Sequence, residues 1–226
     1  MLGRTYCKLP RIHSSGMKII SIAFIACCIL ASCSKDSGGT NPPPSPADGL
    51  MPLQTGDSWD YLRKDYDPAG NLLDSLADHI QVTGSTTVGS TSYYIINWGS
   101  FPVNGNSFFV NTDSSTLTKI DSSTQYIFFK KIAYGDSVLI GNWKDTVSTR
   151  CQGNNYLFAF SDNFTVNGRS CLKNTVSVAD CTGATFEKWV YYLQPQVGLV
   201  RIEHYVLSIS GSFYLKMTED LTNYSV

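Results

Sequence analysis

The chain has 226 residues, of which 42% are hydrophobic, 12% aromatic and 15% charged, and its formal net charge is −1. This apolar content excludes an extended disordered protein, and the charge near zero excludes a strongly basic nucleic-acid-binding protein. Of the 18 acidic residues, 15 are Asp and three are Glu. Because Asp favours turns and Glu favours helices, this imbalance predicts a protein that is poor in helix.

The N-terminal segment has the pattern of a secretory signal peptide. Residues 1–18 carry four basic residues and no acid, and residues 19–31 form an uncharged, mostly apolar run. That run is shorter than the roughly 20 residues of a transmembrane helix, whereas a basic flank before about 7–15 apolar residues is typical of a signal peptide. We therefore predict a signal peptide over residues 1–32, with Met17 as an alternative start.

The apolar run ends in Leu30-Ala31-Ser32-Cys33. This sequence resembles the lipobox of bacterial lipoproteins. The resemblance implies that Cys33 becomes the first residue of the mature chain and carries a diacylglyceryl group that anchors it to a membrane. Ser34 follows, where an inner-membrane retention signal usually has Asp, so the resemblance favours the outer membrane and leaves its periplasmic and cell-surface leaflets open. Ordinary secretion, with Cys33 as a plain thiol, is the alternative.

A linker and one domain follow the expected anchor. Residues 33–49 hold four of the nine prolines and no large apolar side chain, which is typical of a flexible, partly stiff tether. Residues 50–226 are enough to bury a core without disulfides or metals. Removal of residues 1–32 leaves a net charge of −5, so we expect the lipid, and not charge, to hold the protein at a membrane.

Apolar residues in the domain recur with a period of two, which indicates half-buried strands. Trp189, Tyr191 and Leu193 are predicted to share one face of a strand, and so are Tyr94, Ile96 and Trp98. A third predicted face consists of Phe213, Leu215, Met217 and Leu221. Residues 72–82 fit both helical and strand spacing, and we assign them to a strand.

Turn signals separate these segments, among them Asn104-Gly105, Asn167-Gly168 and Ser210-Gly211. Asn-Gly favours the positive φ angles of tight hairpins. The fold class predicted is all-β, an antiparallel meander of about ten strands. A sheet of that size curls, closes or splits, and we favour a curled barrel or half-barrel, with a β-sandwich as the alternative.

Four cysteines remain after residue 32, and lipidation of Cys33 would leave Cys151, Cys171 and Cys181. The cell envelope is oxidising, so we expect one disulfide and one free thiol. We predict the pair Cys171–Cys181, which closes the shorter loop, with Cys151–Cys171 as the competitor.

The sequence carries no recognisable catalytic or cofactor motif. It has no Gly-x-Ser-x-Gly and no His-Glu-x-x-His, and no two of the later cysteines have zinc-finger spacing. Residues 65–70 begin like a calcium loop but lack its later ligands, so a hairpin turn is the better interpretation. We expect no metal, no cofactor and no enzymatic activity.

Two further motifs resemble an uncharacterised group of Bacteroidota lipoproteins. The first is Pro-Leu-x-x-Gly-x-x-Trp-x-Tyr, which includes Gly56, Trp59 and Tyr61, and the second is the Gly-Leu-Val around Gly198. The group brings no activity with it. From the residues themselves, we expect Gly56 to turn the chain into the first strand, Trp59 to fill the core, and Gly198 to form a bend before the penultimate strand.

These observations favour an outer-membrane-anchored lipoprotein whose β domain binds a protein, glycan or lipid ligand without catalysis. A lipid or lipoprotein carrier with an apolar cavity is the first alternative, and an envelope hydrolase is the second. The predicted partner of the anchor is the membrane, through diacylglyceryl-Cys33. Binding to nucleic acid is not expected.

Overall fold

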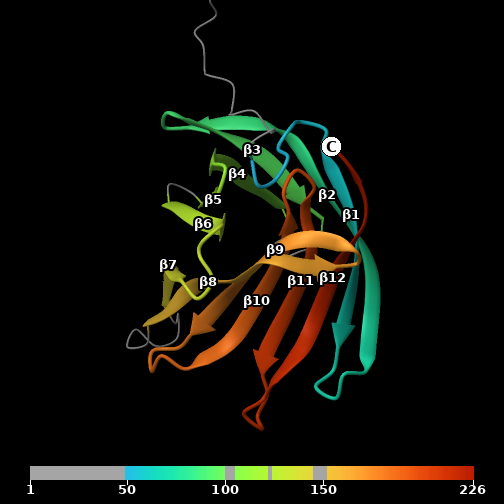
Figure 1. Ribbon diagram of the computed structural model, residues 1–226, viewed down its shortest axis with the longest axis vertical. Coiled ribbons are helices and arrows are strands. Elements are labelled where there is room, and N and C mark those ends of the chain that lie inside the picture. Colours follow the sequence, from blue (N-terminus) through green and yellow to red (C-terminus); the bar gives the residue numbers. More distant parts are fainter. Residues whose placement is uncertain (1–48, 100–104, 122–123, 145–151) are drawn as a thin grey trace, which may run out of the picture. The chain divides into compact units, whose positions relative to one another are not determined.

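The computed structural model describes residues 49–99, 105–121, 124–144 and 152–226, which form an all-β domain (Figure 1). The strands are β1 (Ser58–Tyr66), β2 (Leu72–Val88), β3 (Thr91–Trp98), β4 (Gly105–Asp113), β5 (Thr116–Asp121), β6 (Thr124–Lys130), β7 (Ser137–Lys144), β8 (Gln152–Val166), β9 (Arg169–Ala179), β10 (Thr185–Gln194), β11 (Gly198–Leu207) and β12 (Phe213–Ser225). In these ranges no helix is long and apolar enough to cross a membrane.

The twelve strands form a single sheet in the order β6-β5-β4-β3-β2-β1-β12-β11-β10-β9-β8-β7. All neighbours pair antiparallel, and all are consecutive in sequence except β1 and β12. The first and last strands therefore lie paired in the middle, and the consecutive strands β6 and β7 are the two edges. The predicted curled antiparallel meander is confirmed, with twelve strands instead of about ten. The sheet is not a closed barrel, and because there is one sheet, the sandwich alternative is wrong.

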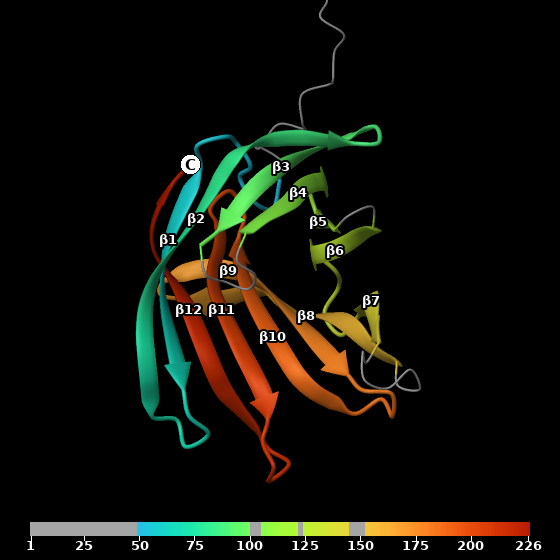
Figure 2. The same ribbon diagram turned by 180° about the vertical axis from the view of Figure 1, so that it is seen from behind.

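The sheet is strongly curled (Figure 2), and contacts between aromatic rings join its distant strands. Trp98 of β3 packs on Phe109, which contacts Phe128 of β6, and Phe128 contacts Tyr191 of β10, with ring centroids 5.8, 5.1 and 5.3 Å apart. Strands that are far apart in the sheet order thus meet across its interior. We call the side that carries this core the concave face and the opposite side the convex face.

The β1–β2 hairpin shows how local sequence sets the strand ends. The Asp67 carboxylate accepts hydrogen bonds from the backbone N–H groups of Ala69 and Asn71, both at 2.8 Å, and Gly70 has a φ of +86°. This turn starts a strand at Leu72 that pairs with both β1 and β3. The predicted hairpin turn and the assignment of residues 72–82 to a strand are both confirmed.

Side-chain alternation holds in β10 and fails in β12. Trp189, Tyr191 and Leu193 lie together against the core, as predicted. In β12, Met217 faces His204 whereas Leu215 faces Tyr205, so Lys216 is an extra residue in a β-bulge. Met217 therefore packs into the concave core while Phe213 lies on the convex face. The prediction that Phe213 and Met217 share a face is wrong, because a bulge reverses the alternation.

Candidate functional site

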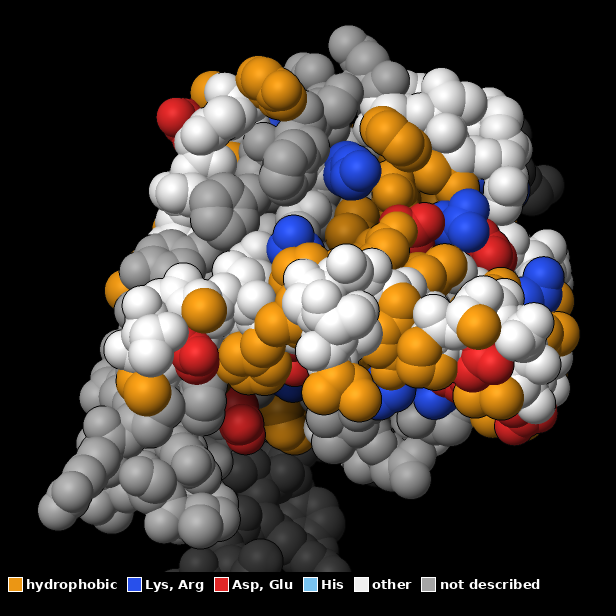
Figure 3. Space-filling model, turned by 90° about the horizontal axis from the view of Figure 1, so that it is seen from below, with side chains coloured by type: hydrophobic (Ala, Val, Ile, Leu, Met, Phe, Trp, Pro, Cys, Tyr) orange, Lys and Arg blue, Asp and Glu red, His pale blue; other side chains and the backbone are white. Residues whose placement is uncertain are grey.

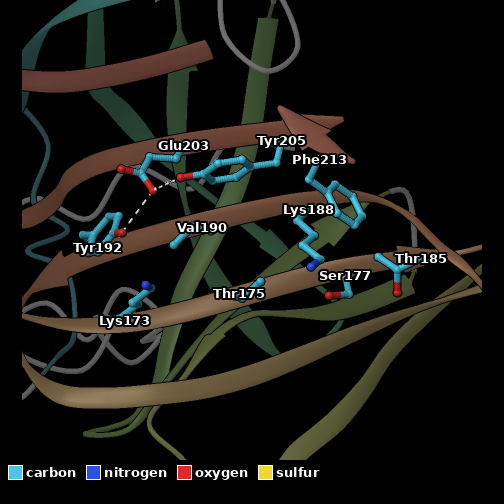
Figure 4. Close-up of a pocket in the computed structure, with 10 residues that line it drawn as sticks. All are labelled: Lys173, Thr175, Ser177, Thr185, Lys188, Val190, Tyr192, Glu203, Tyr205 and Phe213. Atoms are coloured by element: carbon cyan, nitrogen blue, oxygen red, sulfur yellow. Dashed lines mark hydrogen bonds between the residues drawn. The ribbon is translucent and has the colours of Figure 1, made fainter. Parts of the chain in front are cut away.

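A groove of about 630 Å³ lies on the convex face of β9 to β12 (Figure 4). Ten side chains line it: Lys173, Thr175, Ser177, Thr185, Lys188, Val190, Tyr192, Glu203, Tyr205 and Phe213. Its volume falls within the range of roughly 300–1,000 Å³ that is usual for small-ligand sites. The groove is therefore the candidate binding site of the domain.

The register of β9 against β10 builds the floor of the groove. Alternate residues of neighbouring antiparallel strands point to the same side, and directly opposed residues lie next to each other. Three opposed pairs result: Lys173 with Tyr192, Thr175 with Val190, and Ser177 with Lys188. The floor is thus a band of hydroxyl and apolar side chains with a lysine toward each end.

Strands β11 and β12 supply the remaining side. Glu203 lies opposite Val190, and Tyr205 lies opposite Lys188, so both side chains point into the groove from β11. Phe213 joins them because the β12 bulge at Lys216 turns it onto the convex face. Without this extra residue, simple alternation would place Phe213 on the face that Met217 occupies.

Glu203 is held by three side chains from β10 and β11. The hydroxyls of Tyr192 and Tyr205 each donate a hydrogen bond of 3.0 Å to its Oε2, as the dashed lines of Figure 4 show. The Nε of Arg201 lies 3.1 Å from Oε1 in an ion pair. Because both carboxylate oxygens are engaged, Glu203 fixes two aromatic rings in place.

The two tyrosines remain protonated donors at neutral pH. Burial, followed by the charge of Glu203, raises the pKa of Tyr205 to about 12 and the pKa of Tyr192 further above its usual value. Both causes disfavour the phenolate, the first by loss of solvation and the second by repulsion. The hydroxyl groups therefore stay fixed on Glu203 over the physiological pH range.

Each lysine of the groove lies over an aromatic ring. The Nζ of Lys188 is 4.1 Å from the centroid of the Phe213 ring, and the Nζ of Lys173 is 4.6 Å from that of Phe164. Such cation–π contacts hold an ammonium group above a ring. Arg201, which pairs with Glu203, also forms an ion pair of 3.5 Å with Asp220, so the charges along the groove are partly compensated.

The tip of the β8–β9 hairpin lies over the convex face of β10 to β12 (Figure 1). Val166 and Cys171 from this hairpin pack in a small apolar cluster with Val190, Tyr192 and Val200. Val190 and Tyr192 belong to both the cluster and the groove. The hairpin therefore supports the groove from one end.

The concave face carries a buried pair of carboxyl groups. Glu219 of β12 is fully buried and Asp78 of β2 nearly so. Burial, and then the charge of Asp78, raise the pKa of Glu219 to about 8. Neither group lines the groove, so we assign them to the core. Among the described residues, no three His, Cys, Asp or Glu side chains are grouped so that they could hold a metal ion.

Apolar side chains are exposed at two hairpins at the lower end of the sheet in Figure 1. Leu72 and Leu73, at the start of β2, are 55% and 67% exposed, and Ile209, in the β11–β12 turn, is fully exposed. Seen from below, hydrophobic side chains gather in the middle of the described surface, with acidic and basic ones between them (Figure 3). Neither sign of charge forms a continuous patch on this view.

The two sequence motifs at the ends of the domain meet in the core. Trp59 Nε1 donates a hydrogen bond of 2.5 Å to the carbonyl of Val197, and the Tyr61 hydroxyl donates one of 2.8 Å to that of Leu199. Gly198 lies between these two carbonyls with a φ of +102°. Trp59 is a core side chain, as expected, whereas Gly198 is the first residue of β11 and the turn before it is formed by residues 195–197.

Gly56 also has its expected role. Its φ is +105°, and its N–H donates a 2.9 Å hydrogen bond to the carbonyl of Val82, where the chain turns into β1. The lipobox residues Leu30, Ala31, Ser32 and Cys33 lie outside the described residues.

The predicted disulfide Cys171–Cys181 is wrong. Cys171 is a free, buried thiol, whereas Cys181 is disulfide-bonded. The competitor Cys151–Cys171 is wrong for the same reason. Eight residues of extended strand separate Cys171 from Ala179, about 26 Å, far beyond the roughly 7 Å that a disulfide allows between Cα atoms. A short loop in sequence is a long distance here because the chain between the two cysteines is extended in β9.

Of the groove residues, Phe213 alone was named in the sequence analysis, and it was placed on a strand face with Met217 and not in a site. The sequence did indicate that Val190 and Tyr192 of β10 lie on the face opposite the core, because they alternate with Trp189 and Tyr191. What the sequence could not show is that β9, β10 and β11 lie side by side in this register. The position of Phe213 depends in addition on the bulge.

No family model and no curated protein matches the sequence of this chain. Solved structures with a similar fold include a proposed lipoprotein of Parabacteroides distasonis, which is 14% identical with a TM-score of 0.46, and a proposed exported protein of Bacteroides fragilis with a YmcC-like fold, which is 10% identical with a TM-score of 0.47. Each likeness covers 78% of this chain and 98% of the other. A LolA superfamily protein of Nitrosomonas europaea is 10% identical over 80% of this chain and 90% of its own, with a TM-score of 0.32. With so little identity, the site described above rests on this chain's own residues.

Proposed function

We propose that this chain is an outer-membrane-anchored lipoprotein whose β domain binds a ligand in the convex groove without catalysing a reaction. The observation that carries the proposal is the groove itself, about 630 Å³ in volume, with aromatic, hydroxyl and cationic side chains on four neighbouring strands. Regular strands hold its side chains rigidly, which is what a preformed binding site requires.

The arrangement of Glu203 supports a binding role over a hydrolytic one. Among the described residues, Glu203 is the one carboxylate that lines the groove, and its two oxygens are engaged by Tyr192, Tyr205 and Arg201. A general base needs an oxygen within reach of the proton it removes. Here the carboxylate positions neighbouring side chains instead.

The carrier alternative would need an apolar cavity in the concave interior. A cavity there, lined by residues that include Tyr126, Phe128, Ile140 and Tyr191, has a volume of about 210 Å³. This is below the usual range for sites that enclose a small ligand. The convex groove, three times larger, is the better candidate among the described residues.

Ligand binding is tested with the purified full chain and a groove-filling variant. Ser177→Phe places a ring on the floor of the groove, and Ser85→Phe makes the same change at an exposed position of β2. In a thermal-shift and calorimetric screen against saccharides, peptides and fatty acids, we expect ligands that stabilise the parent chain and Ser85→Phe but not Ser177→Phe. If every bound ligand also stabilised Ser177→Phe, the groove would not be the binding site.

The anchor is tested separately in cells. Metabolic labelling with an alkyne fatty acid should label the parent chain in the outer-membrane fraction, and Cys33→Ala should remain unlabelled. Labelling of Cys33→Ala, or a soluble unlabelled parent chain, would contradict the proposal. Protease treatment of intact cells then distinguishes the periplasmic from the cell-surface leaflet.

A further inference from the structure

Two hydroxyl groups on the floor of the groove have no partner within the described part of the chain. Thr175 and Ser177 of β9 are only 6% and 9% exposed, and both side chains line the groove (Figure 4). No hydrogen bond joins either hydroxyl group to another described residue. Because a nearly buried hydroxyl group needs a hydrogen-bond partner, that partner must enter from the groove.

The two hydroxyl groups form a row along β9. Thr175 and Ser177 are two residues apart, so their side chains point to the same side of the sheet, about 7 Å from each other. A hydroxyl group both donates and accepts hydrogen bonds, and a second hydroxyl group can satisfy it in both respects. The floor therefore favours a ligand that carries hydroxyl groups along its length.

Aromatic rings border the same floor from the neighbouring strands. Tyr205 of β11 and Phe213 of β12 line the groove, and Glu203 holds the hydroxyl group of Tyr205 at 3.0 Å. Val190 of β10 adds further apolar surface. Aromatic rings offer flat apolar surfaces, against which the C–H faces of a sugar ring can pack. The groove thus combines hydroxyl groups with rings, which matches the two kinds of surface that a sugar presents.

The charged groups of the groove are engaged within the protein. Glu203 accepts hydrogen bonds from two tyrosines and pairs with Arg201, which also pairs with Asp220. The ammonium groups of Lys173 and Lys188 lie over aromatic rings. Both signs of charge are therefore present, and neither dominates the groove. Since burial of a further charge is costly unless it is paired, the groove favours an uncharged ligand.

Two other classes of ligand fit these features less well. A peptide that joins the sheet as an extra strand requires an open strand edge, but each of the strands β9 to β12 pairs with a neighbour on both sides. A fatty acid would pack on the rings and leave the hydroxyl groups of Thr175 and Ser177 without partners.

From the unpartnered hydroxyl groups, the bordering rings and the engaged charges, we infer that the groove binds an uncharged oligosaccharide. Its hydroxyl groups exchange hydrogen bonds with Thr175 and Ser177, and its ring faces pack on Tyr205 and Phe213. This inference rests on the proposed function and names the ligand class of the same site.

Calorimetric titration of the purified full chain tests the inference. The neutral probes are linear oligosaccharides of glucose, xylose and mannose, and oligogalacturonate is the acidic comparison. We expect at least one neutral probe to bind more tightly than oligogalacturonate. Its affinity should change by less than about twofold between low and high salt, because no ion pair forms with the ligand.

Two groove variants should weaken binding of that neutral probe. Thr175→Val/Ser177→Ala removes both hydroxyl groups and nearly keeps the size of the side chains. It should lose about tenfold in affinity, the effect expected for two hydrogen bonds. Phe213→Leu removes a ring from the opposite side of the groove and should also weaken binding, so the test does not depend on the folding of one variant.

The control variant is Ser85→Ala/Thr87→Val, which removes two exposed hydroxyl groups with the same spacing on β2, outside the groove. It should bind as the parent does. If no neutral probe binds, if oligogalacturonate binds more tightly, or if the control loses as much affinity as the groove variants, the inference is wrong. The proposed function survives that outcome if another ligand binds in a way that Ser177→Phe abolishes. It fails with the inference if Ser177→Phe abolishes binding of no ligand.

Discussion

The two faces of one stretch of sheet differ in what their side chains do. On the concave face of β10 to β12, Trp189, Tyr191 and Met217 pack into a core that reaches across to β3 and β6. On the convex face of the same strands, Lys188 and Tyr205 line an open groove. Because neighbouring residues in a strand point to opposite faces, stability and recognition are separated by single positions in the sequence. Substitutions on the concave face should change stability, and those on the convex face should change binding.

The largest effect is expected for Trp59→Ala on the concave side. Trp59 is fully buried and donates its indole N–H to the Val197 carbonyl. Its truncation should lower the free energy of unfolding by about 3–5 kcal/mol, since it leaves a cavity and an unpaired carbonyl. Chemical denaturation measures this, with Tyr134→Ala, at an 80% exposed position, as the control. Equal losses in the two variants would show that Trp59 does not hold the core.

The second effect is a pH dependence from Glu219. Its folded pKa of about 8 lies above its ordinary value of 4.5, because burial and Asp78 disfavour the charged form. The folded state therefore binds more protons than the unfolded state between these values, and stability falls as pH rises, by up to about 1.4 kcal/mol per pH unit. Glu219→Gln should flatten this slope between pH 5 and pH 8.

The control for Glu219 is Asp121→Asn, which removes an acid at an exposed position. Denaturation midpoints measured from pH 5 to pH 8 should follow the parent slope in Asp121→Asn and not in Glu219→Gln. A parent chain whose stability rose from pH 5 to pH 8 would contradict the raised pKa of Glu219, because a raised pKa makes stability fall as pH rises.

A smaller effect is expected at the contact between the two sequence motifs. In Gly198→Ala the added Cβ would lie 3.0 Å from Trp59 Nε1, and the residue would have to keep a φ of +102°. We expect a loss of about 1–3 kcal/mol. Gly70→Ala, which also has a positive φ but open space around it, should lose less in the same denaturation assay. If Gly70→Ala lost as much, the contact with Trp59 would contribute nothing.

The sequence predicted the strands and one face of the core, and it could not predict the groove. The alternation at Trp189, Tyr191 and Leu193 identified buried positions because burial is a local pattern in a strand. Lys173, Lys188 and Glu203 come together only through the register of three strands, which no local pattern encodes. The bulge at Lys216 and the unpaired Cys171 were missed for the same reason, because each depends on which residues lie opposite in the sheet.

The smallest effect on stability belongs to the convex face, and it sharpens the comparison most. Tyr205→Phe removes one hydroxyl that donates to Glu203, while Tyr192 and Arg201 keep that carboxylate engaged. We expect the free energy of unfolding to fall by about 1 kcal/mol, which is typical of a single hydrogen bond. The affinity for a groove ligand should fall by a larger free energy than this loss of stability, because the ring at position 205 is no longer fixed by Glu203. Tyr61→Phe removes the hydroxyl bonded to the Leu199 carbonyl on the concave side and should lower stability without changing ligand affinity. If Tyr61→Phe weakened binding as much as Tyr205→Phe, the two faces would be coupled, and the separation of recognition from stability in this sheet would not hold.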